Sequence, residues 1–125
     1  MNEILVPISL GELYDRITIL KIKEKKIKEK EKLVNITKEL TLLQKIADAH
    51  VIDSKYYFEL YNVNNTLWTV EDSLIEKERK KEYDDEFIQL ARKVYFTNDK
   101  RSDIKRQINL KYNSTIVEEK SYKQY

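Results

Sequence analysis

The sequence predicts an all-α protein, and three features of its composition lead to that prediction. Charged residues make up 37% of the 125 residues, well above the ordinary quarter, which favours long solvent-exposed helices. The chain has one glycine and one proline, whereas a β-sandwich or barrel needs many turn-forming corners. Its apolar residues recur at the three- and four-residue spacing of amphipathic helices. We therefore expect a single domain, residues 1–125, built as a bundle of about five helices with a long first helix.

The first helix begins with a complete capping signal. Ser9 is followed three residues later by Glu12, which is the S-x-x-E capping box, and Pro7 ends the β-prone segment before it. We expect this helix to run from about Leu10 to about Lys30. Its main apolar stripe consists of Leu10, Leu13, Ile17, Leu20 and Ile27. Gly11 is the only glycine and lies in the first turn, which indicates that a neighbouring element approaches it closely.

Caps and changes of apolar phase delimit the remaining helices. A kink or break near residues 29–32 separates the first helix from a second, which runs to about Ala49. A third helix covers about 55–82, and a fourth and a fifth follow it. Their predicted N-caps are Asp53 or Ser54, Asp84 or Asp85, and Asn98 or Asp99. The tail STIVEEKSYKQY is amphipathic, and its two tyrosines, Tyr122 and Tyr125, lead us to expect that it docks on the bundle.

Several kinds of function are excluded by composition. The chain has no cysteine, so disulfides, thiolate nucleophiles and thiolate metal sites are ruled out. Its one histidine, His50, cannot supply the two E-x-x-H motifs of a di-iron carboxylate bundle. Because G-x-S-x-G and glycine-rich phosphate loops are also missing, we expect neither a cofactor nor a resident metal. The N-terminus lacks a basic leader, and no apolar stretch reaches the roughly 20 residues that span a bilayer, so we expect a cytoplasmic protein without a membrane partner.

The lysine-rich stretch KIKEKKIKEKEK, residues 21–32, raises the question of nucleic-acid binding. Glu24 precedes Lys28 by four residues, which is ordinary pairing along one helix face. No aromatic residue lies between Tyr14 and Tyr56 to stack on a base, and the net charge is only +2. A solvated helix face explains the stretch, and we do not expect a nucleic-acid partner.

The first helix carries an acid where none is expected. On a helical wheel Asp15 falls between Ile19 and Ile22, so this helix has a second apolar side with a carboxylate in it. Glu12 and Arg16, four residues apart, are expected to pair with each other. The two apolar sides predict that the helix is central in the bundle or shared with a second copy of the chain. We therefore expect a homodimer.

The third helix repeats this pattern. Asn64, Glu71 and Glu78 recur every seven residues in the sector that holds its apolar side chains. A buried carboxylate costs several kcal/mol unless it is paired or protonated. The basic residues available as partners are Arg92, Arg101 and Lys105.

Three interpretations of these polar residues remain open. The first is a structural network of ion pairs that fixes helix register. The second is a Mg²⁺ or phosphate site, in which Glu71, Asp72 and Glu78 lie near Glu12 and Asp15, loosely as in all-α nucleotide pyrophosphohydrolases. The chain has the E-x-x-D spacing of such enzymes but no clear partner E-x-x-E. The third is a polar pocket for a protein partner or for a small, for example phosphorylated, ligand.

In order and spacing, the stretches PISLGELYDRITILKIK, KLVNITKEL, LWTVED, FIQLARKVYFTNDKR, IKRQINL and VEEKSY resemble a family of short bacterial and phage proteins classed as a domain of unknown function. The resemblance covers nearly the whole chain. It implies a link to surface-polysaccharide synthesis, because members often accompany or are fused to glycosyltransferases. The chain departs from the family after Lys28, where KEKEK replaces an Asp-Pro break.

The resemblance also implies a set of polar signature residues. They correspond here to Glu12, Asp15, Glu71, Asp72, Arg92, Asn98, Asp99, Arg101, Lys105, Asn109, Glu118, Glu119, Lys120 and Tyr122. Combined with the helical-wheel positions, the candidate site residues are Glu12, Asp15, Asn64, Glu71, Asp72, Glu78, Arg92, Asp99, Arg101 and Lys105. We expect a non-catalytic helical interaction module, accessory to surface-glycan synthesis or a phage counterpart. The alternative is a Mg²⁺-dependent enzyme acting on a phosphorylated or nucleotide substrate.

Overall fold

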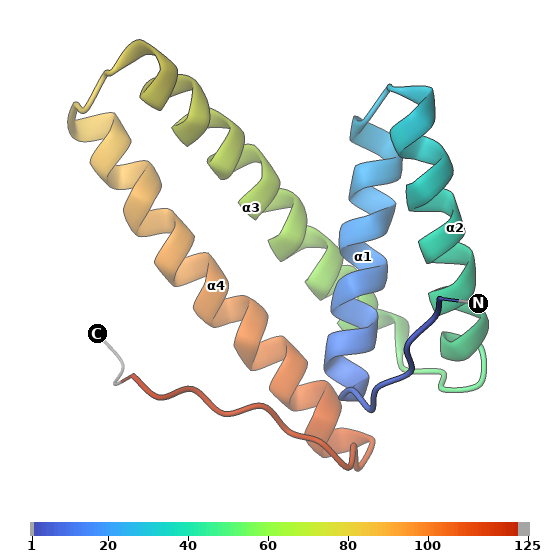
Figure 1. Ribbon diagram of the computed structural model, residues 1–125. Coiled ribbons are helices and arrows are strands. Elements are labelled where there is room, and N and C mark those ends of the chain that lie inside the picture. The colour runs from blue at the N-terminus through green and yellow to red at the C-terminus, as the bar shows by residue number, and fades with distance from the viewer. Residues whose placement is uncertain (1, 123–125) are drawn as a thin grey trace.

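The computed structural model describes residues 2–122, which form four α-helices and no strand. The helices are α1 (Leu10–Lys26), α2 (Lys30–Ala47), α3 (Ser54–Lys80) and α4 (Asp85–Lys111). They form two helical hairpins, α1–α2 and α3–α4, which diverge toward their turns (Figure 1). The all-α prediction is confirmed, but α1 is not the long helix. It has 17 residues, whereas α3 and α4 have 27 each.

The helix starts agree with the predicted caps. The Oγ of Ser9 accepts from the Glu12 N–H at 3.0 Å, and the side chains of Asp53 and Asp84 cap α3 and α4 in the same way. Each side-chain oxygen satisfies a backbone N–H that has no partner inside the helix. The break after α1 begins at Ile27, whose backbone is extended, and it therefore precedes the predicted position by a few residues.

One boundary prediction is wrong, because the expected fourth and fifth helices are a single helix. α4 continues through Asn98 and Asp99, which were expected to cap a new helix. Their side chains have other roles: Asn98 lines a pocket, and the carboxylate of Asp99 accepts from Lys120 at 2.7 Å. No glycine or proline interrupts the stretch, so a residue that is able to cap does not by itself stop the helix.

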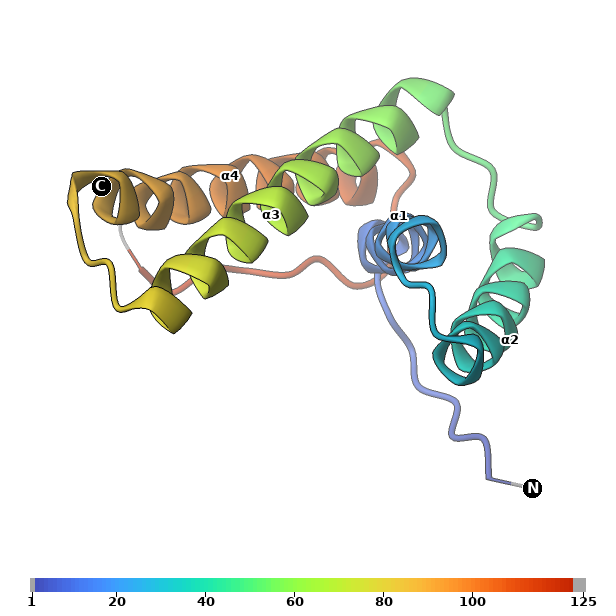
Figure 2. The same cartoon turned by 90° about the horizontal axis from the view of Figure 1, so that it is seen from above.

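α1 is the central helix, as predicted. It packs against α2, α3 and α4, while α3 packs against α1 and α4 (Figure 2). Its buried residues are Gly11, Leu13, Tyr14, Asp15, Ile17, Thr18, Leu20 and Ile22. Ile22 is only 1% exposed and Ile19 is partly buried, so most of the second apolar side of α1 is covered within one chain. The premise on which the homodimer was expected therefore does not hold for this face.

The tail after α4 reverses and runs back along that helix (Figure 1). The reversal is at Asn113, which has a left-handed backbone with φ of 53°. Glu119 then accepts from Arg106 at 3.0 Å, and Lys120 reaches Asp99. The tail thus docks on the bundle as expected, although Tyr125 lies outside the described residues.

Candidate functional site

A buried ion pair joins α1 to α4. Asp15, whose side chain is 1% exposed, accepts from the Nε of Arg101 at 2.8 Å through Oδ1 and from Nη2 through Oδ2. Such bidentate, charge-assisted pairs are the strongest hydrogen bonds that side chains form. The hydrogen bond to Asp15 raises the pKa of Arg101, so the guanidinium stays charged although it is half-buried. This pair explains why α1 tolerates an acid among isoleucines.

An amide from α3 completes the coordination of Asp15. The Nδ2 of Asn64 donates to Oδ1 of Asp15 at 2.9 Å and to Oγ1 of Thr18 at 3.0 Å. Thr18 in turn donates to the backbone carbonyl of Asp15 at 2.8 Å. All three side chains that carry these bonds, Asp15, Thr18 and Asn64, are buried. The network therefore fixes the rotation of α1, α3 and α4 relative to one another, because any change of register would strand a buried polar group.

A second ion pair lies one helical turn before Asp15. The carboxylate of Glu12 accepts from Lys105 at 2.7 Å and from Arg16 at 2.9 Å, and Lys105 also reaches Glu118 at 3.1 Å. Burial raises the pKa of Glu12, but the hydrogen bonds from Lys105 and Arg16 outweigh it, and the pKa is lowered overall. Burial lowers the pKa of Lys105, but its hydrogen bonds to Glu12 and Glu118 outweigh that effect, and the pKa is raised overall. Both groups are therefore charged at neutral pH.

We predict that Glu12→Gln lowers the free energy of unfolding by about 1 kcal/mol at neutral pH and has little effect in acid. The pKa of Glu12 in the folded chain lies below its ordinary value of 4.5. Its ionic contribution is therefore complete above that value and is lost as the pH falls through the folded-state pKa. Urea unfolding of both proteins at neutral pH and at about pH 3 measures this. Glu24→Gln, on the exposed face of α1, is the control, and a difference that persists unchanged in acid would contradict the assignment.

The start of α1 is pressed against α4. The Gly11 N–H donates to Oδ1 of the buried Asn109 at 2.7 Å. A Cβ on Gly11 would lie 2.5 Å from the carbonyl oxygen of Lys105, far inside contact distance. The sequence prediction that Gly11 makes room for a close neighbour is thus confirmed, and the neighbour is the backbone of α4.

A pocket of about 220 Å³ opens beside the Asp15–Arg101 pair. Residues of α1, α3 and α4 line it: Ile19, Ile22, Lys23, Asn64, Leu67, Trp68, Glu71, Asn98 and Arg101. Ile22, Asn64 and Leu67 are buried, whereas Lys23 and Trp68 are partly exposed. The pocket therefore combines an apolar wall with charged and amide groups, which is the usual make-up of a small-molecule site.

The structure brings together five of the ten candidate residues. Glu12, Asp15, Asn64, Arg101 and Lys105 form the network described above. Glu71 lines the adjoining pocket but is exposed, and Asp99 binds the tail instead. The others lie apart from it and are exposed: Asp72; Glu78, which accepts from the Tyr83 hydroxyl; and Arg92, which donates to Gln89 and lies over Phe96.

The prediction that Glu71 and Glu78 point into an apolar core sector is therefore wrong. Beyond Val70 no residue of α3 is buried, because α1 does not extend along that part of the helix. Within residues 2–122, no three Asp, Glu or His side chains are grouped as a metal ion would require. The carboxylates on which the magnesium hypothesis rests are thus not assembled in the described part of the chain.

Two members of the site did not emerge from the helical-wheel analysis. Thr18 lies three residues after Asp15, so its place on the same helix face could have been read from the sequence. Asn109 was indicated only by the family resemblance. Its partner is a backbone N–H on a distant segment, and no spacing in the sequence signals such a contact.

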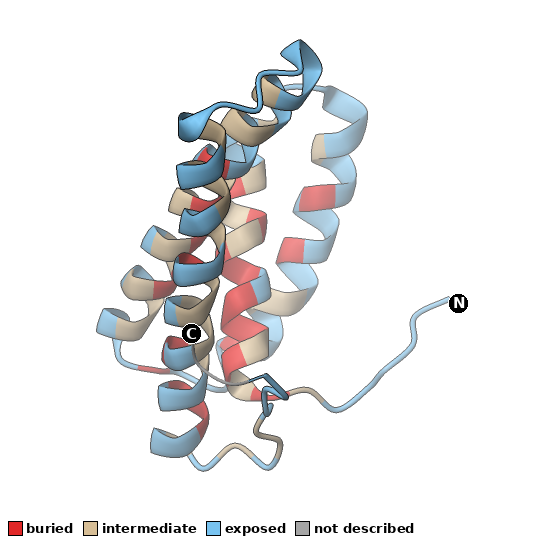
Figure 3. Ribbon diagram, turned by 90° about the vertical axis from the view of Figure 1, so that its left-hand side faces the viewer, coloured by how far each residue is buried: buried red, intermediate tan, exposed pale blue. Residues whose placement is uncertain are grey.

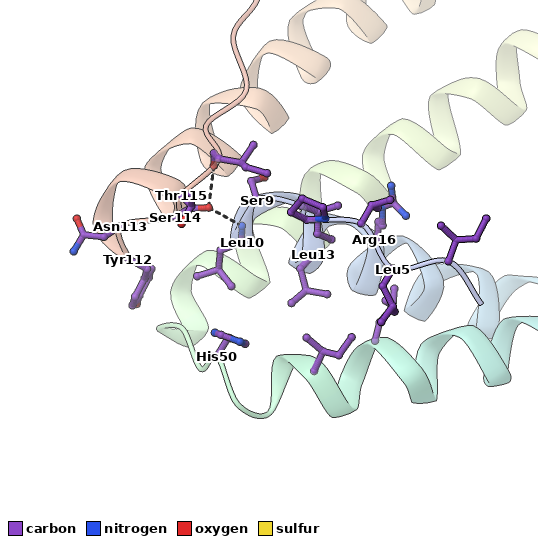
Figure 4. A pocket seen from close by; sticks show the side chains of 17 residues that line it. Leu5, Ser9, Leu10, Leu13, Arg16, His50, Tyr112, Asn113, Ser114 and Thr115 are labelled. Atoms are coloured by element: carbon purple, nitrogen blue, oxygen red, sulfur yellow. Dashed lines mark hydrogen bonds between the residues drawn. The ribbon is translucent and has the colours of Figure 1, made fainter. Parts of the chain in front are cut away.

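A larger hollow, of about 640 Å³, lies at the N-terminal segment and shares no lining residue with the pocket beside Arg101. Residues 4–8, the first turns of α1, and Leu43 and Ile46 of α2 line it (Figure 4). On the side of α4, the Leu10 N–H donates to Ser114, whose hydroxyl donates to the carbonyl of Ile116. The lining is mostly apolar, and its polar members include Arg16 and His50.

A family described as a family of unknown function, DUF6165, matches residues 4–125, and the chain belongs to it. The resemblance to such a family is thereby confirmed. No curated protein and no solved structure matches the chain. None of the helices in residues 2–122 combines the length and the apolar character that crossing a membrane requires.

Proposed function

We propose that this member of the DUF6165 family is a non-catalytic helical interaction module whose partner is a second copy of the same chain. One observation carries the proposal: the distal half of the α3–α4 hairpin, residues 71–96, contains no buried residue. Figure 3 shows this part of the hairpin in the colours of intermediate and exposed residues, while buried residues follow α1.

The distal hairpin is nevertheless rich in large apolar side chains. Those that are about half exposed or more are Ile75, Tyr83, Ile88, Tyr95 and Phe96. Exposed apolar side chains mark interaction surfaces where they lie together. The cause is a mismatch of helix lengths, since helices of 27 residues are about 40 Å long and α1, with 17 residues, is only about 25 Å long. The third helix needed to cover the hairpin is therefore missing from this half.

The turn of the distal hairpin is held by ion pairs within the chain. Lys77 forms ion pairs with Glu82, Asp84 and Glu86 across the turn, and the hydrogen bond that it donates to Asp84 is the largest cause of its raised pKa. Two identical hairpins packed face to face bury the apolar residues of both copies and form a four-helix bundle. Dimers with two-fold symmetry are the commonest homo-oligomers.

Sedimentation equilibrium tests this proposal. We expect the wild-type chain to be a dimer at micromolar concentration, and Ile88→Glu and Ile75→Glu each to give a folded monomer. Both side chains are about half exposed in the single chain, so the substitutions leave its own core intact. Val34→Glu is the matched control, because Val34 is an exposed apolar residue on α2, outside the hairpin. A wild-type chain that stays monomeric throughout the concentration range would overturn the proposal, as would dimers that are unaffected by both hairpin substitutions.

The resemblance supports placing this module in surface-glycan synthesis, as an accessory protein or a phage counterpart. That part of the proposal rests on the frequent association of similar proteins with glycosyltransferases, and it has its own test. The wild-type chain should copurify with a glycosyltransferase encoded beside its gene, and a chain that never does so would remove this assignment without affecting the dimer.

A further inference from the structure

The pocket beside Arg101 has polar groups with unused hydrogen-bonding capacity. Within residues 2–122 the side chains of Lys23, Glu71 and Asn98 make no hydrogen bond or ion pair, although all three line the pocket. Lys23 and Glu71 carry opposite charges and do not pair with each other. All three are at least partly exposed, so their polar atoms are free to bind a ligand that enters the pocket.

The fixed cation of the pocket is Arg101. Its Nε and Nη2 are bound to the buried Asp15, which holds the guanidinium in one orientation. A guanidinium has five N–H donors, so donors remain for an oxyanion in the pocket. The preorganised arginine, with Lys23 beside it, suits a carboxylate group of a ligand.

The charge balance of the lining selects the kind of ligand. Asp15 neutralises Arg101, which leaves Lys23 and Glu71 as one positive and one negative charge. A simple anion would be repelled by Glu71, and a simple cation by Lys23. A ligand that carries both charges satisfies the two sides together.

The remaining wall of the pocket is apolar and aromatic. Ile19, Leu67 and Trp68 line it, and Ile22 closes it from within the bundle. With a volume of about 220 Å³ the pocket is smaller than the usual sites for drug-sized molecules. We propose that this pocket binds a small zwitterion with an apolar body, of the size of a single amino acid. Its carboxylate lies at Arg101 and Lys23, its ammonium at Glu71, and its side chain against Trp68.

The only tryptophan of the chain is Trp68, so its fluorescence reports on the pocket alone. We expect free leucine to change this emission in a saturable way. 4-Methylpentanoate, which is leucine without its ammonium group, and isoamylamine, which is leucine without its carboxylate, should each bind about tenfold more weakly or worse, since each forfeits one charged contact. Equal binding of 4-methylpentanoate and leucine would overturn the zwitterion. A response to inorganic phosphate without one to leucine would overturn it too, and would assign a phosphorylated ligand to the pocket instead.

Two substitutions at exposed or partly exposed positions test the assigned contacts without disturbing the buried pair. Glu71→Gln should abolish the preference for leucine over 4-methylpentanoate, and Lys23→Gln should weaken both ligands about tenfold. Asp72→Asn is the matched control, because Asp72 is exposed, adjacent to Glu71 and outside the pocket. If Trp68 emission is unchanged by leucine at about 10 mM, or if the control variant behaves like Glu71→Gln, the proposal fails.

Discussion

Gly11→Ala is expected to lower the free energy of unfolding by about 2 kcal/mol, although the same exchange inside a helix normally raises it. Alanine is favoured over glycine in helices by roughly 1 kcal/mol. At Gly11, however, the new Cβ would lie 2.5 Å from the backbone oxygen of Lys105 and 2.9 Å from Oδ1 of Asn109. Overpacking against backbone costs about 3 kcal/mol, because α1 and α4 must move apart. Urea unfolding of the two proteins measures the difference.

Two further variants separate the collision from other effects. Glu24→Ala, on the exposed face of the same helix, controls for helix propensity and should be nearly neutral. Adding Asn109→Ala to Gly11→Ala should not restore stability, because the nearest contact is the backbone of Lys105 rather than the Asn109 side chain. A Gly11→Ala protein as stable as the wild type would show that α1 and α4 do not approach as closely as described.

The sequence predicted those parts of the fold that depend on local chemistry. The caps at Ser9, Asp53 and Asp84 were predictable because each satisfies backbone donors only two or three residues away. The close approach at Gly11 was predictable because glycine weakens a helix. Its presence in the first turn therefore indicates that a neighbour occupies the space that a Cβ would fill. The same local logic failed at Asn98 and Asp99, where the side chains bind elsewhere and the helix continues.

The candidate site was predictable only in part, because burial along α3 depends on the length of another helix. Asn64 and Glu71 occupy equivalent heptad positions, yet Asn64 is buried against α1 and Glu71 is exposed. A helical wheel shows which residues share a face, and it cannot show where the neighbouring helix ends. Arg92 and Arg101 were expected from their charge to pair with the carboxylates of the third helix. Arg101 binds Asp15 of α1 instead, and Arg92 turns toward Gln89 and Phe96.

Arg101→Met should destabilise the chain more than any other single substitution in the site, by about 3 kcal/mol. It leaves the carboxylate of Asp15, which is 1% exposed, with Lys105 at 3.9 Å as its remaining cation. Neither that longer ion pair nor the Asn64 amide replaces two charge-assisted bonds. Asp15→Asn should cost less, about 2 kcal/mol, because the guanidinium is 30% exposed and can turn toward water.

The double variant, Asp15→Asn with Arg101→Met, decides what the pair contributes. Removing both charges leaves no uncompensated ion in the interior, so the double variant should be more stable than Arg101→Met alone. Its loss of unfolding free energy should be well below the sum of the losses in the two single variants. Urea unfolding of all four proteins gives the coupling energy directly. Strict additivity would mean that Asp15 and Arg101 do not interact in solution, and α1 would then owe its place against α4 to its other contacts, including the Glu12–Lys105 ion pair. A double variant that keeps its fold but loses the response of Trp68 to leucine would instead show that Arg101 is needed for the ligand and that the pair is dispensable for folding.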